Sequence, residues 1–124
     1  MNFQLSTTKK LKTNLMSKNF NAIIVVAGEP KSVFLELYLK SFNKFKHTPL
    51  LLVSNYKLLS DQMKLLKIKK LIRIINKDKK IDFQKLNNKR INLVDIPLDY
   101  KNLKKIDIKK TNIHIKECFN FANA

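Results

Sequence analysis

The sequence predicts an α/β protein with a mostly parallel sheet and flanking helices. Short apolar runs without polar alternation, such as Ala22–Ala27 and Pro49–Val53, are typical of strands that are buried on both faces, as parallel strands are. Segments with apolar residues at helical spacing alternate with these runs, which is the order of a parallel sheet with right-handed crossover connections. A chain of 124 residues suits one small domain.

Residues 1–21 form a basic leader for which the sequence predicts no regular element, so we expect ordered structure to begin at Ala22. The leader lacks the apolar stretch and the small-residue cleavage site of a secretory signal. Two interpretations stay open: the leader is disordered, or the start is over-extended and translation begins at Met16. The intact mass of the natively expressed protein distinguishes them, because a product that retains Met1 excludes the later start.

The first half of the domain, residues 22–75, reads as three strands and two helices. The strand Ala22–Ala27 is closed by Gly28, and a helix capped by Ser32 is expected to follow. The strand Pro49–Val53 precedes a second amphipathic helix, and Leu71–Ile75 reads as a third strand. The apolar positions of the two helices are Val33, Phe34, Leu37 and Phe42 in the first and Leu58, Leu59, Met63 and Leu66 in the second.

The second half reads as a polar connection, a strand and a final helix. Residues 76–90 are polar, with one short turn expected around Phe83, and Ile91–Ile96 is the fourth strand. The final helix opens with Thr111 and is expected to place Ile115, Cys118, Phe119 and Ala122 on one face. This helix is still in register at Ala122, so we expect residues 22–124 to be an incomplete α/β domain that is cut within its last helix.

Composition excludes several classes of site. A single glycine, Gly28, rules out every glycine-rich phosphate-binding loop. A single cysteine, Cys118, rules out a disulfide within the chain and a cysteine zinc site, and it fits a reducing compartment. The formal net charge of +17 favours nucleic acid as a partner, yet all basic residues except Arg73 and Arg90 are lysines. Lysine is abundant together with Asn and Ile, and A/T-rich codons encode all three residues. The base composition of the gene therefore explains the lysines at least as well as a binding function does, and a solvated basic surface is the alternative interpretation.

Few side chains offer catalytic chemistry. His47 is expected in a solvated loop, His114 in an exposed first turn of the last helix, and Cys118 as a buried structural thiol. These residues have no metal-ligand spacing and no triad partners, so we predict no catalytic, metal or cofactor-binding residue in the chain. The informative feature is the turn after the first strand, with Gly28, Glu29, Pro30 and, in the following helix, Glu36 as candidates for lying near a ligand. A plain strand-to-helix turn is the alternative interpretation.

The order of residues around this turn resembles the N-terminus of the 4-hydroxythreonine-4-phosphate dehydrogenase family, whose first strand is followed by G-[D/E]-P-A-G-I-G-P-E. Gly28, Glu29, Pro30 and Glu36 match that motif, and Val33 stands for its isoleucine. Downstream stretches are also similar, so that the resemblance extends from about Ala22 to Ala122: Pro49–Val53, Leu58-Leu59, Met63–Ile68 and Asn92–Asp95. The two motif glycines are replaced by Ser32 and Phe34, and the second proline by Leu35.

The resemblance implies a two-domain α/β fold similar to isocitrate and isopropylmalate dehydrogenases, a homodimer and a cytoplasmic enzyme. It implies NAD-dependent oxidation of 4-phosphooxy-threonine, followed by decarboxylation, in pyridoxal phosphate biosynthesis, with a divalent metal ion that polarises the hydroxyl and stabilises the enolate. The metal-binding histidines and the Gly-His-Thr motif of the family have no counterpart in residues 1–124. We therefore expect an N-terminal portion that is inactive alone. A self-contained basic module that binds nucleic acid and a degenerate enzyme copy are the alternatives.

Overall fold

The computed structural model describes residues 8–12 and 21–123, and it confirms an α/β fold with a parallel sheet of four strands flanked by helices. A fifth strand, β1, pairs antiparallel with β2, and the sheet order is β1-β2-β3-β5-β4. The leader residues 1–7 and 13–20, including Met16, lie outside the described residues. The strands are β1 (Thr8–Lys12), β2 (Asn21–Val26), β3 (Leu50–Ser54), β4 (Ile72–Ile74) and β5 (Ile91–Asp95).

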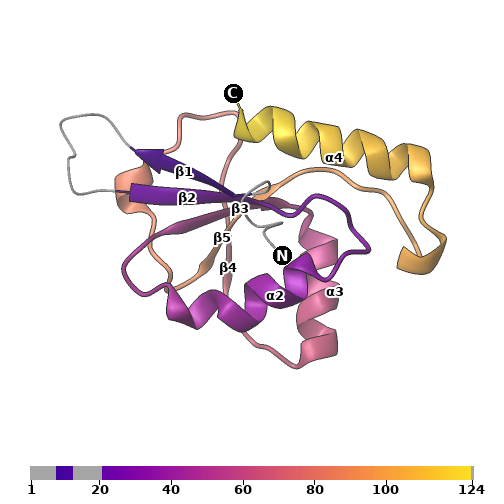
Figure 1. Cartoon of the computed structure of the whole chain (residues 1–124), viewed down its shortest axis with the longest axis horizontal. Coiled ribbons are helices and arrows are strands. Elements are labelled where there is room, and N and C mark those ends of the chain that lie inside the picture. The colour runs from indigo at the N-terminus through magenta and orange to yellow at the C-terminus, as the bar shows by residue number, and fades with distance from the viewer. Residues whose placement is uncertain (1–7, 13–20, 124) are drawn as a thin grey trace.

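The helices lie on both faces of the sheet (Figure 1). The chain runs from β2 to β3 and on past β5 to β4 in one direction, so right-handed crossovers place α2 and α3 on the same face. It then turns back from β4 to β5, which puts that connection and the following α4 on the opposite face. The helices are α2 (Phe34–Ser41), α3 (Tyr56–Leu66) and α4 (Ile108–Ala122), with short 3-10 turns η2 (Phe42–Lys44), η3 (Phe83–Lys85) and η4 (Leu103–Lys105).

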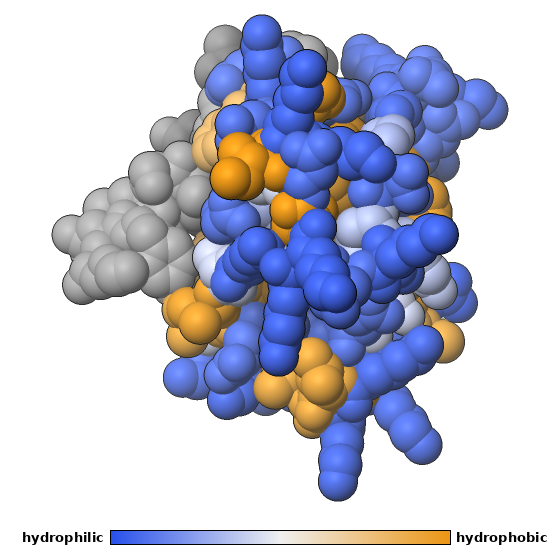
Figure 2. Space-filling view, turned by 90° about the vertical axis from the view of Figure 1, so that its right-hand side faces the viewer, coloured by the Kyte–Doolittle hydropathy of each residue, from blue (hydrophilic) through white to orange (hydrophobic). Residues whose placement is uncertain are grey.

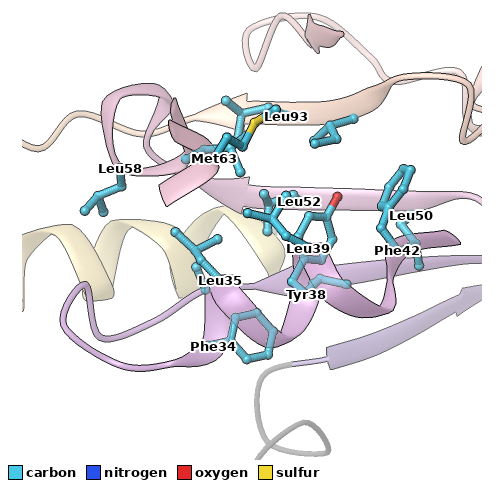
Figure 3. Packing of buried hydrophobic residues seen from close by; sticks show 14 of the residues in the cluster. Phe34, Leu35, Tyr38, Leu39, Phe42, Leu50, Leu52, Leu58, Met63 and Leu93 are labelled. Carbon is cyan, nitrogen blue, oxygen red and sulfur yellow. The ribbon is translucent and has the colours of Figure 1, made fainter. Parts of the chain in front are cut away.

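Each face of the sheet has its own core. On the face of α2 and α3, alternate residues of the central strands pack against both helices, and Figure 3 shows Leu52 beside Leu39 of α2 and Leu93 beside Met63 of α3. On the other face, residues such as Leu51 and Val53 pack against α4. Both sets are almost completely buried, which explains why the strands carry no polar alternation.

Two predictions about the elements are wrong. Ordered structure does not begin at Ala22, because Thr8–Lys12 forms β1 on the outer side of β2. A strand of this kind is held by backbone hydrogen bonds to its neighbour, so it needs no apolar pattern that a sequence would reveal. Likewise α4 does not open at Thr111: it starts at Ile108, and the carboxylate of Asp107 accepts a hydrogen bond from the Lys109 N–H.

The first helix is also rotated relative to its predicted face. Val33 is 62% exposed and Leu37 is only half-buried, whereas Leu35, Tyr38 and Leu39 turn inward. Ser32 does not occupy the N-cap position of α2, although its hydroxyl accepts a hydrogen bond from the Phe34 N–H at 3.2 Å. The helix therefore starts one residue later than a Ser32 cap predicts, and its buried residues are Phe34, Leu35, Tyr38 and Leu39.

Candidate functional site

The candidate site lies at the edge of the sheet where the parallel strands end. Loops after β2 and β5 project from this edge in Figure 1, and they face the viewer in Figure 2. That surface is mostly hydrophilic and is interrupted by small apolar patches. In open parallel sheets this edge is where ligands collect, because the strand ends and the following helix starts converge there.

The turn after β2 is built by a single left-handed residue. Gly28 has φ +68°, a region that other residues adopt only at a cost, and the backbone then closes through a hydrogen bond from the Ser32 N–H to the Glu29 carbonyl at 3.1 Å. The Glu29 carboxylate accepts a further bond from the Lys31 N–H. Pro30 is buried against the neighbouring residues. The turn is thus fixed by its own local hydrogen bonds.

The conformation of Gly28 gives a direct stability prediction. A Cβ atom at this position would meet no atom within 4 Å, so the cost of Gly28→Ala comes from the left-handed backbone alone. We expect a loss of about 1–2 kcal/mol in the free energy of unfolding, measured by urea denaturation. Gly28→Asn is the matched variant and should lose less, because asparagine tolerates this region. Equal losses for both variants would contradict this explanation.

Two hollows flank the turn. One, of about 380 Å³, lies between the turn and the start of α4 and is lined by Glu29, Lys31, Ser32, Ile106, Ile108, Thr111 and Asn112. The other, of about 300 Å³, lies between the turn, α3 and the loop after β5, and its polar lining includes Ser32, Asp61, Gln62, Tyr100 and Asn102. The ammonium group of Lys31 also reaches the Lys104 carbonyl, at 3.4 Å, so the two loops touch across the edge.

Only part of the predicted group is brought together. Gly28, Glu29 and Pro30 form the turn, and Glu29 and Pro30 line the first and the second hollow respectively. Glu36 lines neither hollow. It lies on α2, where its carboxylate pairs with the Lys40 ammonium at 2.9 Å as an exposed i,i+4 ion pair.

Two polar side chains that the sequence did not predict, Asn55 and Asp95, join the ends of β3 and β5 through hydrogen bonds. The Asn55 side chain accepts a hydrogen bond from the Leu58 N–H at 3.1 Å and donates one to the Ile96 carbonyl at 2.9 Å. The Asp95 carboxylate accepts from the Tyr56 N–H at 2.8 Å. An asparagine directly after an apolar strand and before a helical pattern is a recognisable N-cap signal, so Asn55 could have been found.

The sequence predicted an exposed His114, but the side chain is buried, with 1% of its surface accessible. Its Nδ1 lies 3.0 Å from the Pro97 carbonyl, and its Nε2 lies 3.5 Å from Cys118 Sγ. A carbonyl only accepts, so Nδ1 carries the proton and Nε2 is free to accept from the thiol. His114 lies four residues before Cys118 and eight before Ala122, so it falls on the same buried stripe of α4. The spacing of four residues to Cys118 was the signal for this.

Burial decides the protonation of this pair. It lowers the pKa of His114, against smaller raising effects of the Pro97 carbonyl and of the charges on Glu117 and Asp95. Burial likewise raises the pKa of the Cys118 thiol to about 12, with a smaller contribution from Glu117. Neutral imidazole and neutral thiol are the stable forms, and the thiol is no nucleophile at neutral pH. Cys118 is buried, as predicted, and His47 is exposed in a loop, as expected.

A third polar group lies beside the second hollow. The Tyr100 hydroxyl donates to the Asp61 carboxylate at 2.8 Å, and the Lys57 ammonium lies 4.0 Å from the centre of the Tyr100 ring and donates to the Tyr100 carbonyl. Burial, followed by the hydrogen bond to Asp61, raises the pKa of Tyr100. This group ties the loop after β5 to α3 and gives the hollow a fixed wall.

The described residues contain no group of three His, Cys, Asp or Glu side chains that could hold a metal ion. No helix in the described part of the chain is long and apolar enough to cross a membrane. No protein-family model matches this chain, and no curated protein matches it with significance. The edge of the sheet where the strands end presents charged and polar side chains around two hollows.

Proposed function

We propose that this chain is the N-terminal portion of an NAD-dependent 4-hydroxythreonine-4-phosphate dehydrogenase. The observation that carries the proposal is the position of the residues Gly28, Glu29 and Pro30, which match the family motif. They form the turn at the carboxyl end of β2, between two hollows. A ligand-proximal role requires this position, and a turn at the opposite edge of the sheet would have removed the argument.

The residues present do not fit a metal ion or a dinucleotide by themselves. No glycine-rich loop can be formed from one glycine, and the described residues offer no group of three metal ligands. We therefore assign no catalytic step to this part of the enzyme. Its role in the proposal is structural and substrate-facing: the sheet holds the turn, and Glu29 and Lys31 present charges to one hollow, where a small phosphorylated amino acid would lie.

The residues that replace the motif glycines, Phe34 and Ser32, fit the structural and the substrate-facing role respectively. Phe34 stands where the family motif has a glycine, and its side chain projects from the first residue of α2 and is buried in the core (Figure 3). It therefore does not fill the hollows, neither of which it lines. Ser32 replaces the other glycine and lines both hollows, so the turn presents a small polar side chain to each of them.

The test begins with the coding DNA beyond the codon for Ala124. An open frame that reaches a Gly-His-Thr motif and further histidines is the expected result. The protein from that whole frame should form NADH from NAD and 4-phosphooxy-threonine with a divalent metal ion, and the 124-residue chain alone should not. Absence of NADH formation by the whole, folded protein would overturn the proposal.

The net charge of +17 supports a second candidate, a basic module that binds nucleic acid. This candidate predicts an affinity that falls steeply with salt, with a log–log slope of about −0.9 for each phosphate contacted. Fluorescence anisotropy with single-stranded and duplex probes at about 50 mM salt, where such contacts are strong, decides it. No detectable binding would remove this candidate and leave the dehydrogenase proposal unaffected.

A further inference from the structure

The outer side of β4 is an open edge of the sheet. Strand β4 comes last in the sheet order, and no described residue pairs with its free side. On the inner side, the Ile91 N–H donates to the Leu71 carbonyl at 2.9 Å and the Ile75 N–H donates to the Leu93 carbonyl at 2.8 Å. Backbone groups alternate in direction along a strand, so those of Ile72 and Ile74 point away from β5. An extended peptide could pair with them.

A groove runs beside this edge on the side of α3. It has a volume of about 840 Å³ and lies between one stripe of α3 and the segment that enters β4. Its apolar lining consists of Tyr56, Met63, Ile68, Leu71 and Ile72. Leu71 is 66% exposed, and farther along the strand Ile74 is 52% exposed. A strand added to β4 would bring every second residue of its own over Ile72 and Ile74, which share the face of the strand that borders the groove.

The charge of the groove is of one sign. Lys64, Lys67, Lys69 and Lys70 line it, and no carboxylate does. The chain has no acidic residue from Gln62 to Lys77, and Arg73 adds a further positive charge on β4 itself. Positive charges at the edge of a sheet disfavour pairing between identical chains, and two copies of this chain would bring Arg73 and the lysines beside the groove together. An acidic segment meets no such repulsion and gains from the lysines.

We propose that the β4 edge and its groove bind an acidic, extended polypeptide segment with alternating apolar residues, which adds a strand to the sheet. The backbone of Ile72 and Ile74 provides the hydrogen bonds, the groove takes the apolar side chains, and the flanking lysines select acidic residues. This inference does not rest on the proposed dehydrogenase function.

The experiment uses the 124-residue chain and three labelled peptides. One peptide alternates valine with glutamate, the second alternates valine with lysine, and the third is the acidic peptide with a central proline. We expect binding of the first alone, measured by fluorescence anisotropy, since the second carries the wrong charge and the third cannot pair as a strand. Binding of the third peptide equal to that of the first would overturn the proposal, and so would no binding of any peptide.

Variants of the chain separate strand pairing from charge. Ile74→Pro removes an outward N–H without touching the bonds to β5, so it should weaken binding of the acidic peptide about tenfold, whereas Ile74→Val should not. Lys64→Glu with Lys69→Glu should abolish the preference for the acidic peptide, and each single variant is compared with Lys116→Glu on α4, the same charge reversal away from the groove. Circular dichroism and thermal unfolding verify that each variant folds. If Ile74→Pro does not fold, the variant with both lysines replaced still tests the proposal.

Two other occupants of the groove, a second copy of the chain and a nucleic acid, are distinguished with the same variants. Sedimentation velocity detects a second copy: a dimer of the chain that Ile74→Pro dissociates would overturn the proposal in favour of self-pairing. A single-stranded oligonucleotide that competes for the groove, with an affinity that Ile74→Pro leaves unchanged, would identify a charge-only site. We expect a monomer and no such competition.

Discussion

Replacing Leu52 by alanine should remove about 2–5 kcal/mol from the free energy of unfolding, which is a large part of the roughly 5–15 kcal/mol that stabilises a typical domain. Leu52 lies on the central strand β3 with 0% of its surface exposed, between β2 and β5 and beneath α2 and α3. The truncation leaves a cavity that the surrounding strands cannot close, because both neighbours hold their register through backbone hydrogen bonds.

Urea denaturation followed by circular dichroism measures this effect. The matched control is Leu65→Ala, the same chemical change on the outer surface of α3, where the leucine is 77% exposed. We expect a change within about 0.5 kcal/mol for the control. Comparable losses at both positions would mean that the sheet is not the centre of the core. The Leu52 variant also bears on the candidate site. Asn55 follows β3 and Asp95 ends β5, so loss of the packing between these strands would also disturb their hydrogen bonds.

The second large effect is expected with acid. Burial lowers the pKa of His114 in the folded protein below the ordinary value of 6.5, so between these two pKa values the unfolded chain binds more protons than the folded one. The contribution of neutral His114 to the free energy of unfolding is therefore fully present above pH 6.5. This contribution is lost as the pH falls below 6.5, by up to about 1.4 kcal/mol for each pH unit, until the folded-state pKa of His114 is reached. Protonation also costs the bond that Nε2 accepts from Cys118.

Unfolding curves between about pH 7 and pH 5 measure this dependence, a range that brackets the ordinary histidine pKa. His114→Asn should flatten it, since the asparagine amide can still donate toward the Pro97 carbonyl but does not titrate. His47→Gln is the control: that histidine lies exposed in a loop, and its replacement should leave the pH dependence of the wild type unchanged. A dependence that survives in His114→Asn would assign it to other groups.

The sequence by itself determined the four parallel strands and the two helices between β2 and β4. Runs such as Leu50–Val53 are too apolar for any position but a sheet covered on both faces, and the spacing of Leu58, Leu59 and Met63 fixes the buried side of α3. The short turn around Phe83 was also predicted, and η3 confirms it. These signals are local, because burial on a regular element imposes its own periodicity.

Only the tertiary structure decided which side chains meet. The order β3-β5-β4 brings Asp95 beside the start of α3 and leaves β4 at the open edge, and strand order is not encoded within either strand. The packing of α4 on the sheet places His114 against the Pro97 carbonyl, whereas the sequence predicted an exposed side chain in the first turn. Strand β1 depends entirely on pairing with β2. Contacts between distant segments depend on the placement of whole elements, and the residue pattern within one element does not determine that placement.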